Sequence, residues 1–312
     1  MNDFRLPLGD WADSFIDFIT EVFGGFFAVV RGIFAGFYDL VDFALQTPPF
    51  WVVIVAFAAI AWLAKGWKLA VGTAVGLVVI VGVDQWDNAM STLALVLVAS
   101  LIAVAISVPL GVLAASSDTA SKIIRPILDF MQTMPAMVYL IPALILFRVG
   151  VVPGIVATII FAMAPGVRLT ELGIRGVDKE VVEAGQAFGS SPWRILRQIQ
   201  LPLAMPSIMA GVNQVIMLSL SMVVIAGMVG AGGLGGEVVQ SLTRIDVGLG
   251  FEAGLSVVIL AIILDRVTGA LGTPRKPGRR REQASSTDAS VPADAIDEIG
   301  TRIASPARVP VA

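Results

Sequence analysis

The sequence predicts an all-α protein that crosses a membrane several times, and two observations support this prediction. First, only 14% of the 312 residues are charged and 56% are hydrophobic, whereas about a quarter of the residues in a typical soluble domain are charged. Second, the apolar residues form long runs, most of them near the roughly 20 residues that a helix needs to cross a bilayer. Such runs must be helical, because lipid offers no hydrogen-bond partners to an open backbone.

We identify about seven candidate spans, which suit one membrane domain better than several soluble ones. The first two are short and flank the basic turn 65–68, so they are either spans or a re-entrant pair. The fourth contains Pro135 and Pro142, which predict a kink or a break. This break is either a packing irregularity or a discontinuous helix beside a transport pathway. The seven runs are residues 50–64, 68–83, 89–115, 123–147, 153–169, 205–230 and 251–271.

The two ends of the chain differ in character from the membrane domain predicted over residues 50–272. In residues 1–49, phenylalanine recurs at roughly helical spacing and acidic residues outnumber basic ones. This pattern predicts an N-terminal amphipathic extension that lies in the membrane interface, or alternatively a further helix packed on the bundle. Residues 273–312 open with a basic run and continue with a Ser-, Ala-, Pro- and Asp-rich stretch, so we expect a disordered tail.

The orientation of the chain follows from the positions of lysine and arginine near the ends of the spans. With seven spans, almost all of the basic segments lie on one side, which the positive-inside rule identifies as the cytoplasmic side. The sequence therefore predicts a multi-pass protein of the cell (inner) membrane with an extracytoplasmic N-terminus and a cytoplasmic C-terminus. The basic segments are 65–68, 122–125, 168–197 and 275–281.

Several chemistries are absent from the sequence. The chain has no cysteine and no histidine, which removes thiolate chemistry and the commonest general base and metal ligand. Runs 89–115 and 205–230 hold no ionisable residue of the kind that ion-coupled carriers place in their spans. The glycine-rich run 230–236 lacks the Lys-Ser/Thr of a phosphate-binding loop, so we expect a flexible outer turn with close helix approach. We predict no catalytic residue, metal site or bound cofactor, and an energy source on another protein.

Residues 178–201 form a polar island that predicts a helix, a turn and a second helix. Asp178 and Glu180 favour a helix N-terminus, Gly189 suits the left-handed residue after a helix end, and Ser191-Pro192 is typical of the start of another helix. A short helix that projects from a membrane domain suits insertion into a groove on a partner protein. The alternative is an amphipathic hairpin that lies on the lipid surface.

This island resembles the EAA loop in the membrane subunits of ATP-binding-cassette importers. That pattern is Glu-Ala-Ala, three residues, Gly, nine residues, then Ile-x-Leu-Pro, and the only departure is Gly185 for the second alanine, which loosens the helix by up to about 1 kcal/mol. The resemblance implies that segment 171–205 is a cytoplasmic coupling loop, that Glu183, Ala184, Gly185 and Gly189 face an ATPase subunit, and that ATP is hydrolysed there. The chain itself is then not an enzyme. The matching residues are Glu183, Ala184, Gly185, Gly189, Ile199, Leu201 and Pro202.

A larger part of the chain, roughly 86–272, resembles the glycine betaine/proline betaine permease branch of these importers, on segments 132–154, 174–214, 220–235 and 258–272. The resemblance implies a type I importer membrane domain acting as a pair of permeases. The pair is expected to be a homodimer, and a pair formed with a related permease is the alternative. It also implies two ATPase copies, an extracytoplasmic binding protein and contact with membrane lipid, but no nucleic acid.

The implied substrates are glycine betaine and related quaternary amines such as proline betaine, choline and carnitine. Tyr139, Asn213 and Gln214 are candidate pathway-lining residues, and an aromatic ring such as that of Tyr139 or Trp86 attracts a quaternary ammonium group by about 0.5–2 kcal/mol. Interfacial anchoring is the other interpretation of Trp86. Two functions remain as alternatives: an importer permease for another small solute such as an amino acid, and an ATP-independent carrier or channel.

Overall fold

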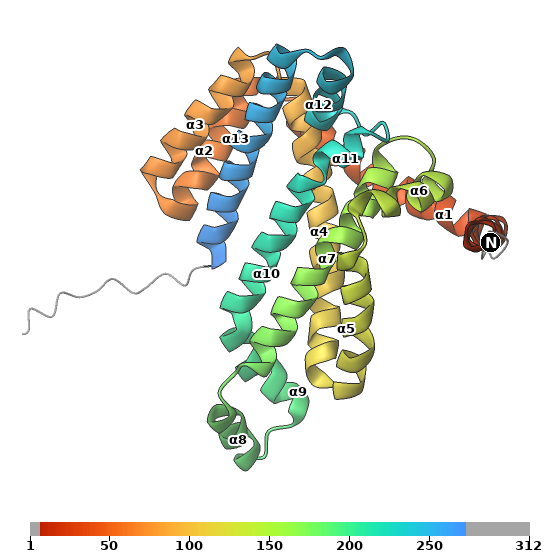
Figure 1. Ribbon diagram of the computed structural model, residues 1–312. Helices are drawn as coiled ribbons and strands as arrows, with labels where there is room; N and C mark the ends of the chain where they lie inside the picture. Colours follow the sequence, from red (N-terminus) through yellow and green to blue (C-terminus); the bar gives the residue numbers. More distant parts are fainter. Residues whose placement is uncertain (1–6, 273–312) are drawn as a thin grey trace, which may run out of the picture. The chain divides into compact units, whose positions relative to one another are not determined.

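The computed structural model describes residues 7–272, and this part of the chain consists of helices and short turns with no β-strand (Figure 1). The predicted all-α class is confirmed, while the predicted tail 273–312 lies outside the described residues. The elements are α1 (Leu8–Gln46), α2 (Phe50–Lys65), α3 (Trp67–Gly82), α4 (Trp86–Ser116), α5 (Asp118–Thr133), α6 (Ala136–Phe147), α7 (Val151–Arg175), α8 (Lys179–Ala187), α9 (Pro192–Ile195), the π-helical turn η1 (Leu196–Gln200), α10 (Leu201–Ser221), α11 (Val223–Gly227), α12 (Gly233–Arg244) and α13 (Val247–Gly272).

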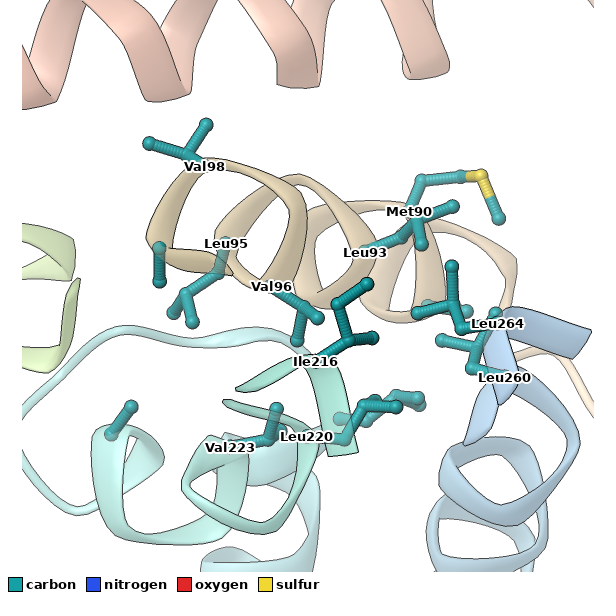
Figure 2. Packing of buried hydrophobic residues seen from close by; sticks show 14 of the residues in the cluster. Met90, Leu93, Leu95, Val96, Val98, Ile216, Leu220, Val223, Leu260 and Leu264 are labelled. Carbon is teal, nitrogen blue, oxygen red and sulfur yellow. The ribbon is translucent and has the colours of Figure 1, made fainter. Parts of the chain in front are cut away.

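The centre of the bundle is formed by α4, α7 and α10, with α13 packed on α10. Figure 2 shows side chains of α4, α10 and α13 gathered in the main apolar core, among them Val96, Ile216 and Leu260. Small residues let the helices approach closely, as is common between membrane helices. A Cβ atom on Gly111 of α4 would lie 2.7 Å from the carbonyl oxygen of Val167 in α7.

The number of helices that could span a membrane differs from the seven predicted. Among the described residues, five helices are long and apolar enough, or six if α5 and α6 form one broken span. Helices α2 and α3 have 16 residues each, a rise of about 24 Å against a hydrocarbon core of about 30 Å. Helix α1, which we predicted as an extension, does meet the length and composition test.

The fourth predicted run is broken, as its prolines indicate. Helices α5 and α6 meet at an angle of 98°, and the backbone at Met134 and Pro135 is extended. Pro135 cannot donate the hydrogen bond that would continue α5. The hydroxyl of Tyr139 donates across the bend to the carbonyl oxygen of Met131. Of the two predicted forms, a kink or a break, the structure has the break.

Helix α1 has three distinct faces along its 39 residues. Its C-terminal half packs against the bundle through residues that include Phe34, Tyr38 and Leu45, and its charged residues recur on a second face. The third face is apolar and exposed over nearly the whole helix. Its members are Trp11, Phe15, Phe18, Val22, Phe26, Val29, Ile33, Phe37, Leu40 and Phe43. Helix α1 therefore has the amphipathic pattern expected of an interfacial helix, and it also packs on the bundle, as the alternative prediction expected.

The glycine-rich turn between α11 and α12 brings two backbones together. Gly227 and Gly235 lie so close that a Cβ on Gly227 would be 2.3 Å from the carbonyl carbon of Gly235. The hydroxyl of Thr92 in α4 accepts a hydrogen bond from the backbone N–H of Leu234 at 2.8 Å, so the start of α12 is tied to α4. The predicted close helix approach is confirmed, at the end of the bundle opposite to α8 (Figure 1).

Candidate functional site

A hairpin formed by α8 and α9 projects from the end of the bundle where α7 ends and α10 begins (Figure 1). The carboxylate of Asp178 caps α8 by accepting a hydrogen bond from the backbone N–H of Glu180 at 3.0 Å. Gly189 makes the turn with a positive φ of 75°, a conformation that costs glycine little. Pro192 occupies the first turn of α9 after Ser191. The predicted helix–turn–helix is confirmed.

The outer surface of this hairpin is exposed and has both charged and large apolar side chains. Glu183 and Ala184 are exposed, and the residues Phe188 and Trp193 are 91% and 66% exposed. Within residues 7–272, Glu183 makes no hydrogen bond or ion pair. A free carboxylate beside exposed aromatic groups is a surface suited to binding another protein.

Gly185 lies on the opposite side of α8, and here the structure corrects the expectation that it faces a partner. It is buried against the second half of the hairpin, where an added Cβ would lie 2.9 Å from Cδ1 of Ile199 and 3.4 Å from Cγ1 of Ile195. The 3.6-residue helical period places Gly185 nearly opposite Glu183. Gly185 therefore sets the spacing inside the hairpin, and Glu183 belongs to its outer surface.

We expect Gly185→Ala to leave the stability of the protein within about 1 kcal/mol of its original value. Alanine favours the helix by up to about 1 kcal/mol, and the closest atom is the end of a flexible isoleucine side chain, whose displacement from a rotamer costs about 0.5–1.5 kcal/mol. The thermal unfolding midpoint of the detergent-solubilised protein checks this expectation. A large decrease would show that the hairpin cannot adjust around Ile199.

The connection from the hairpin to α10 is a π-helical turn over Leu196–Gln200. The backbone N–H of Leu201 bonds to the carbonyl oxygen of Leu196, five residues earlier. In a continuous α-helix, the ring of Pro202 would clash with the carbonyl group of residue 198. Pro202 also has no backbone N–H to donate to that carbonyl. The wider turn is consistent with relief of this clash. Leu201 packs in a small core with Ile174 and Ile208, so this end of the motif anchors the hairpin to the bundle.

The three candidate pathway residues have different surroundings. The Asn213 side-chain amide donates to Asp265 of α13 at 3.0 Å and accepts from the hydroxyl of Thr268 at 2.6 Å. Tyr139 is bonded across the α5–α6 bend. Gln214 is exposed and makes no hydrogen bond with the residues that the structure describes. Of the three, the side chain of Gln214 is the one available to a pathway, and the pathway role stays a prediction.

Gln214 belongs to an exposed face of α10 that is poorly suited to lipid. An amide transferred to an apolar medium without a hydrogen-bond partner costs several kcal/mol, roughly 2–7. We therefore expect this face to meet water or another protein. Its exposed members are Leu203, Pro206, Ala210, Gln214 and Ser221.

We expect Asn213→Ala to destabilise the contact between α10 and α13 by about 0.6–2 kcal/mol, the range measured for hydrogen bonds between membrane helices. The substitution leaves Asp265 and Thr268 without their partner on α10. A lower thermal unfolding midpoint checks the prediction. Gln214→Ala on the adjacent position is the control, and an equal loss in both variants would contradict the role of the Asn213 hydrogen bonds.

The comparisons with known proteins agree with this architecture. Residues 107–273 match the family described as the binding-protein-dependent transport system inner membrane component. The chain belongs to this family. It is therefore a permease, the membrane component of a transport system, as the resemblance implied.

Several relatives are similar over most of this permease. It is 49% identical over 275 residues to the glycine betaine/carnitine transport permease protein GbuB of Listeria monocytogenes, covering 87% of this chain and 97% of that one. It is 50% identical over 281 residues to the glycine betaine/proline betaine transport system permease protein ProW of Escherichia coli, covering 88% and 78%. These matches confirm the resemblance to the glycine betaine branch.

A solved structure shares the fold of the permease. An inward-facing structure of the MetNI methionine ABC transporter superposes with a TM-score of 0.56 at 21% identity, covering 60% of this chain and 94% of that chain. At this identity the similarity concerns the fold alone. It confirms the predicted type I importer membrane domain.

One group of charged residues was not predicted from the sequence. Glu171 lies in α7, which continues six residues beyond the predicted end at 169, and its buried carboxylate is bonded to Ser121, Arg125 and Arg175. The sequence does place Glu171 four residues before Arg175 in a mostly apolar helix, a spacing that predicts an ion pair between them. The contribution of α5 to this cluster is not visible in any local pattern.

Proposed function

We propose that this permease is the membrane subunit of an ATP-driven importer of glycine betaine and related quaternary amines. The observation that supports the substrate most directly is the 47–50% identity, over 87–88% of the chain, to relatives named as glycine betaine permeases. ATP is hydrolysed on a separate ATPase, and the permease binds no cofactor of its own.

The exposed hairpin supports the proposed ATPase partner. Glu183, Phe188 and Trp193 form a protruding surface. The carboxylate of Glu183 has no ion-pair partner within residues 7–272. In this proposal the hairpin occupies a groove of the ATPase, with one ATPase copy for each of two permeases. The side of the membrane that holds the hairpin and the C-terminus is then the cytoplasm.

The exposed polar face of α10 supports a second permease copy. Two copies that bring Gln214 and Ser221 toward each other would enclose a polar pathway and remove these groups from lipid. We propose a homodimer, with the extracytoplasmic binding protein delivering substrate to its other end. At that extracytoplasmic end, helix α1 would lie in the membrane interface. A helix of about 58 Å with charges along its length suits the interface better than the hydrocarbon core.

The proposal is tested by uptake of radiolabelled glycine betaine into proteoliposomes that contain the permease and its ATPase. We expect uptake that requires both ATP and the binding protein, and competition by proline betaine, choline or carnitine. Uptake that persists without the binding protein or ATP would contradict the importer, and would favour a carrier or channel. Uptake of an amino acid in place of glycine betaine would contradict the substrate class alone.

A further inference from the structure

A cluster of charged side chains ties α5 to the end of α7 that leads into the hairpin. Its centre is the carboxylate of Glu171, whose side chain is only 4% exposed. The hydroxyl of Ser121 donates to Oε1 at 2.7 Å, and Arg125 donates to both carboxylate oxygens, at 2.8 Å from Nη2 and 3.3 Å from Nε. The Nε atom of Arg175 lies 3.1 Å from Oε1. The buried carboxylate is thus fully supplied with donors from two helices.

Arg175 extends this cluster to a third helix. It donates to the carboxylate of Asp118 at 2.7 Å and to the backbone carbonyl of Ala114 at 2.9 Å. The ends of α4, α5 and α7 therefore meet at two residues of α7, Glu171 and Arg175. A second ion pair, Arg168–Asp129, links α5 and α7 further along, but both of its side chains are exposed, at 41% and 64%.

The position of the cluster connects the hairpin to α5. Arg175 is the last residue of α7, and α8 begins at Lys179, so a displacement of the hairpin acts directly on this end of α7. The face of α5 turned away from α7 is exposed and carries Ile123, Ile127 and Phe130. Beyond it, α5 ends at the sharp bend into α6.

Apolar packing between α5 and α7 is limited to a small group centred on Leu128, Ala164 and Val167. Such packing allows neighbouring helices to slide, whereas charge-assisted hydrogen bonds fix a direction as well as a distance. A buried ion cluster adds little net stability compared with apolar side chains of the same size. Its principal effect here is to hold α5 in one register on α7.

We infer that Glu171 is a positioning residue that transmits movement of the α8–α9 hairpin to α5. The inference rests on the proposed function, in which an ATPase moves the hairpin. Glu171 touches neither substrate nor ATP. It makes α5 follow the end of α7, so that the exposed face of α5 and the bend into α6 change position when the hairpin moves.

The test compares Glu171→Gln with Asp129→Asn, which breaks the exposed ion pair between the same two helices. We expect Glu171→Gln to lower the amount of substrate imported per ATP hydrolysed by about tenfold or more, the effect of losing hydrogen bonds to a charged group. For Asp129→Asn the same ratio should stay within about twofold of the original protein, because an exposed ion pair contributes little. An unchanged ratio in Glu171→Gln, or an equal fall in both variants, would overturn the inference.

Labelling of single introduced cysteines measures the movement directly. The chain contains no cysteine of its own, so each introduced thiol is the only one in the permease that reacts. A thiol introduced by Ile127→Cys on α5 should change its labelling rate with a maleimide when ATP is trapped on the ATPase, and this change should disappear when Glu171→Gln is added. A thiol introduced by Phe188→Cys should stay protected by the ATPase in both backgrounds. Continued response of the α5 thiol in the Glu171→Gln background would overturn the inference.

A second variant covers the case in which Glu171→Gln does not fold. Ser121→Ala keeps every charge and removes one hydrogen bond to Glu171, and should lower the transport ratio about fivefold; an unchanged ratio would count against the inference. Failure of the proposed function has a different signature. The original protein would then show no ATP-dependent uptake and no protection at position 188 by the ATPase.

Discussion

Replacing Gly235 by alanine is expected to destabilise the permease by about 3 kcal/mol or more, the upper range for overpacking a closely packed site. The added Cβ would lie 2.1 Å from the carbonyl oxygen of Val223 and 2.8 Å from its carbonyl carbon. Both atoms belong to the backbone of α11, so no side chain can rotate to make room. Helix α12 must move away from α11, and the hydrogen bond from Leu234 to Thr92 is expected to be lost with it.

The measurement is the thermal unfolding midpoint of the detergent-solubilised permease, with Gly236→Ala as the matched control. A Cβ at Gly236 would have no atom within 4 Å, and alanine in place of glycine favours a helix by up to about 1 kcal/mol. The control should therefore be as stable as the original protein or slightly more stable. Similar midpoints for Gly235→Ala and Gly236→Ala would show that α11 and α12 are not in backbone contact.

Reversing the charge at Glu183 is expected to abolish ATP-dependent uptake while leaving the permease folded. Loss of one partner of a charge pair at a protein interface costs about 2–5 kcal/mol, which weakens binding of the ATPase by about 30-fold or more. The fold should tolerate Glu183→Lys, because the carboxylate has no partner among residues 7–272. Co-purification of the ATPase and the thermal unfolding midpoint measure the two effects separately.

The same substitution distinguishes the two interpretations of the hairpin. If the hairpin lies on anionic lipid, a lysine at this position adds attraction of about 1 kcal/mol, and uptake should be retained. Glu183→Gln is the control, since it removes the charge but keeps the shape, and its effect should be intermediate. Full uptake and full ATPase binding by Glu183→Lys would show that Glu183 does not contact the ATPase.

Features encoded over a few neighbouring residues were predictable. The break at Pro135 follows from a fixed φ and a missing N–H, and the hairpin follows from the cap at Asp178 and the turn at Gly189. The family followed from the spacing of its loop, which the comparisons support. The span count was less accurate, because hydropathy does not separate a 16-residue apolar helix from a full span, or a long surface helix from one that crosses the membrane.

Contacts between residues distant in the sequence could not be predicted. The sequence made Asn213 a candidate for a pathway, and only the fold shows its hydrogen bond to Asp265, 52 residues later. Gly185 matched a position expected to face a partner, whereas the fold buries it against Ile199.

By itself, the sequence determined that this chain is a helical membrane permease with a projecting, polar hairpin, because apolar run length, proline, glycine and helix caps act locally. Only the tertiary structure decided which side chains of that hairpin are available to a partner, and that Glu171 joins α5 to α7 through Ser121 and Arg125. The physical reason is that an amphipathic pattern fixes which residues share a helix face, while the rotation and register of each helix depend on the neighbour against which it packs.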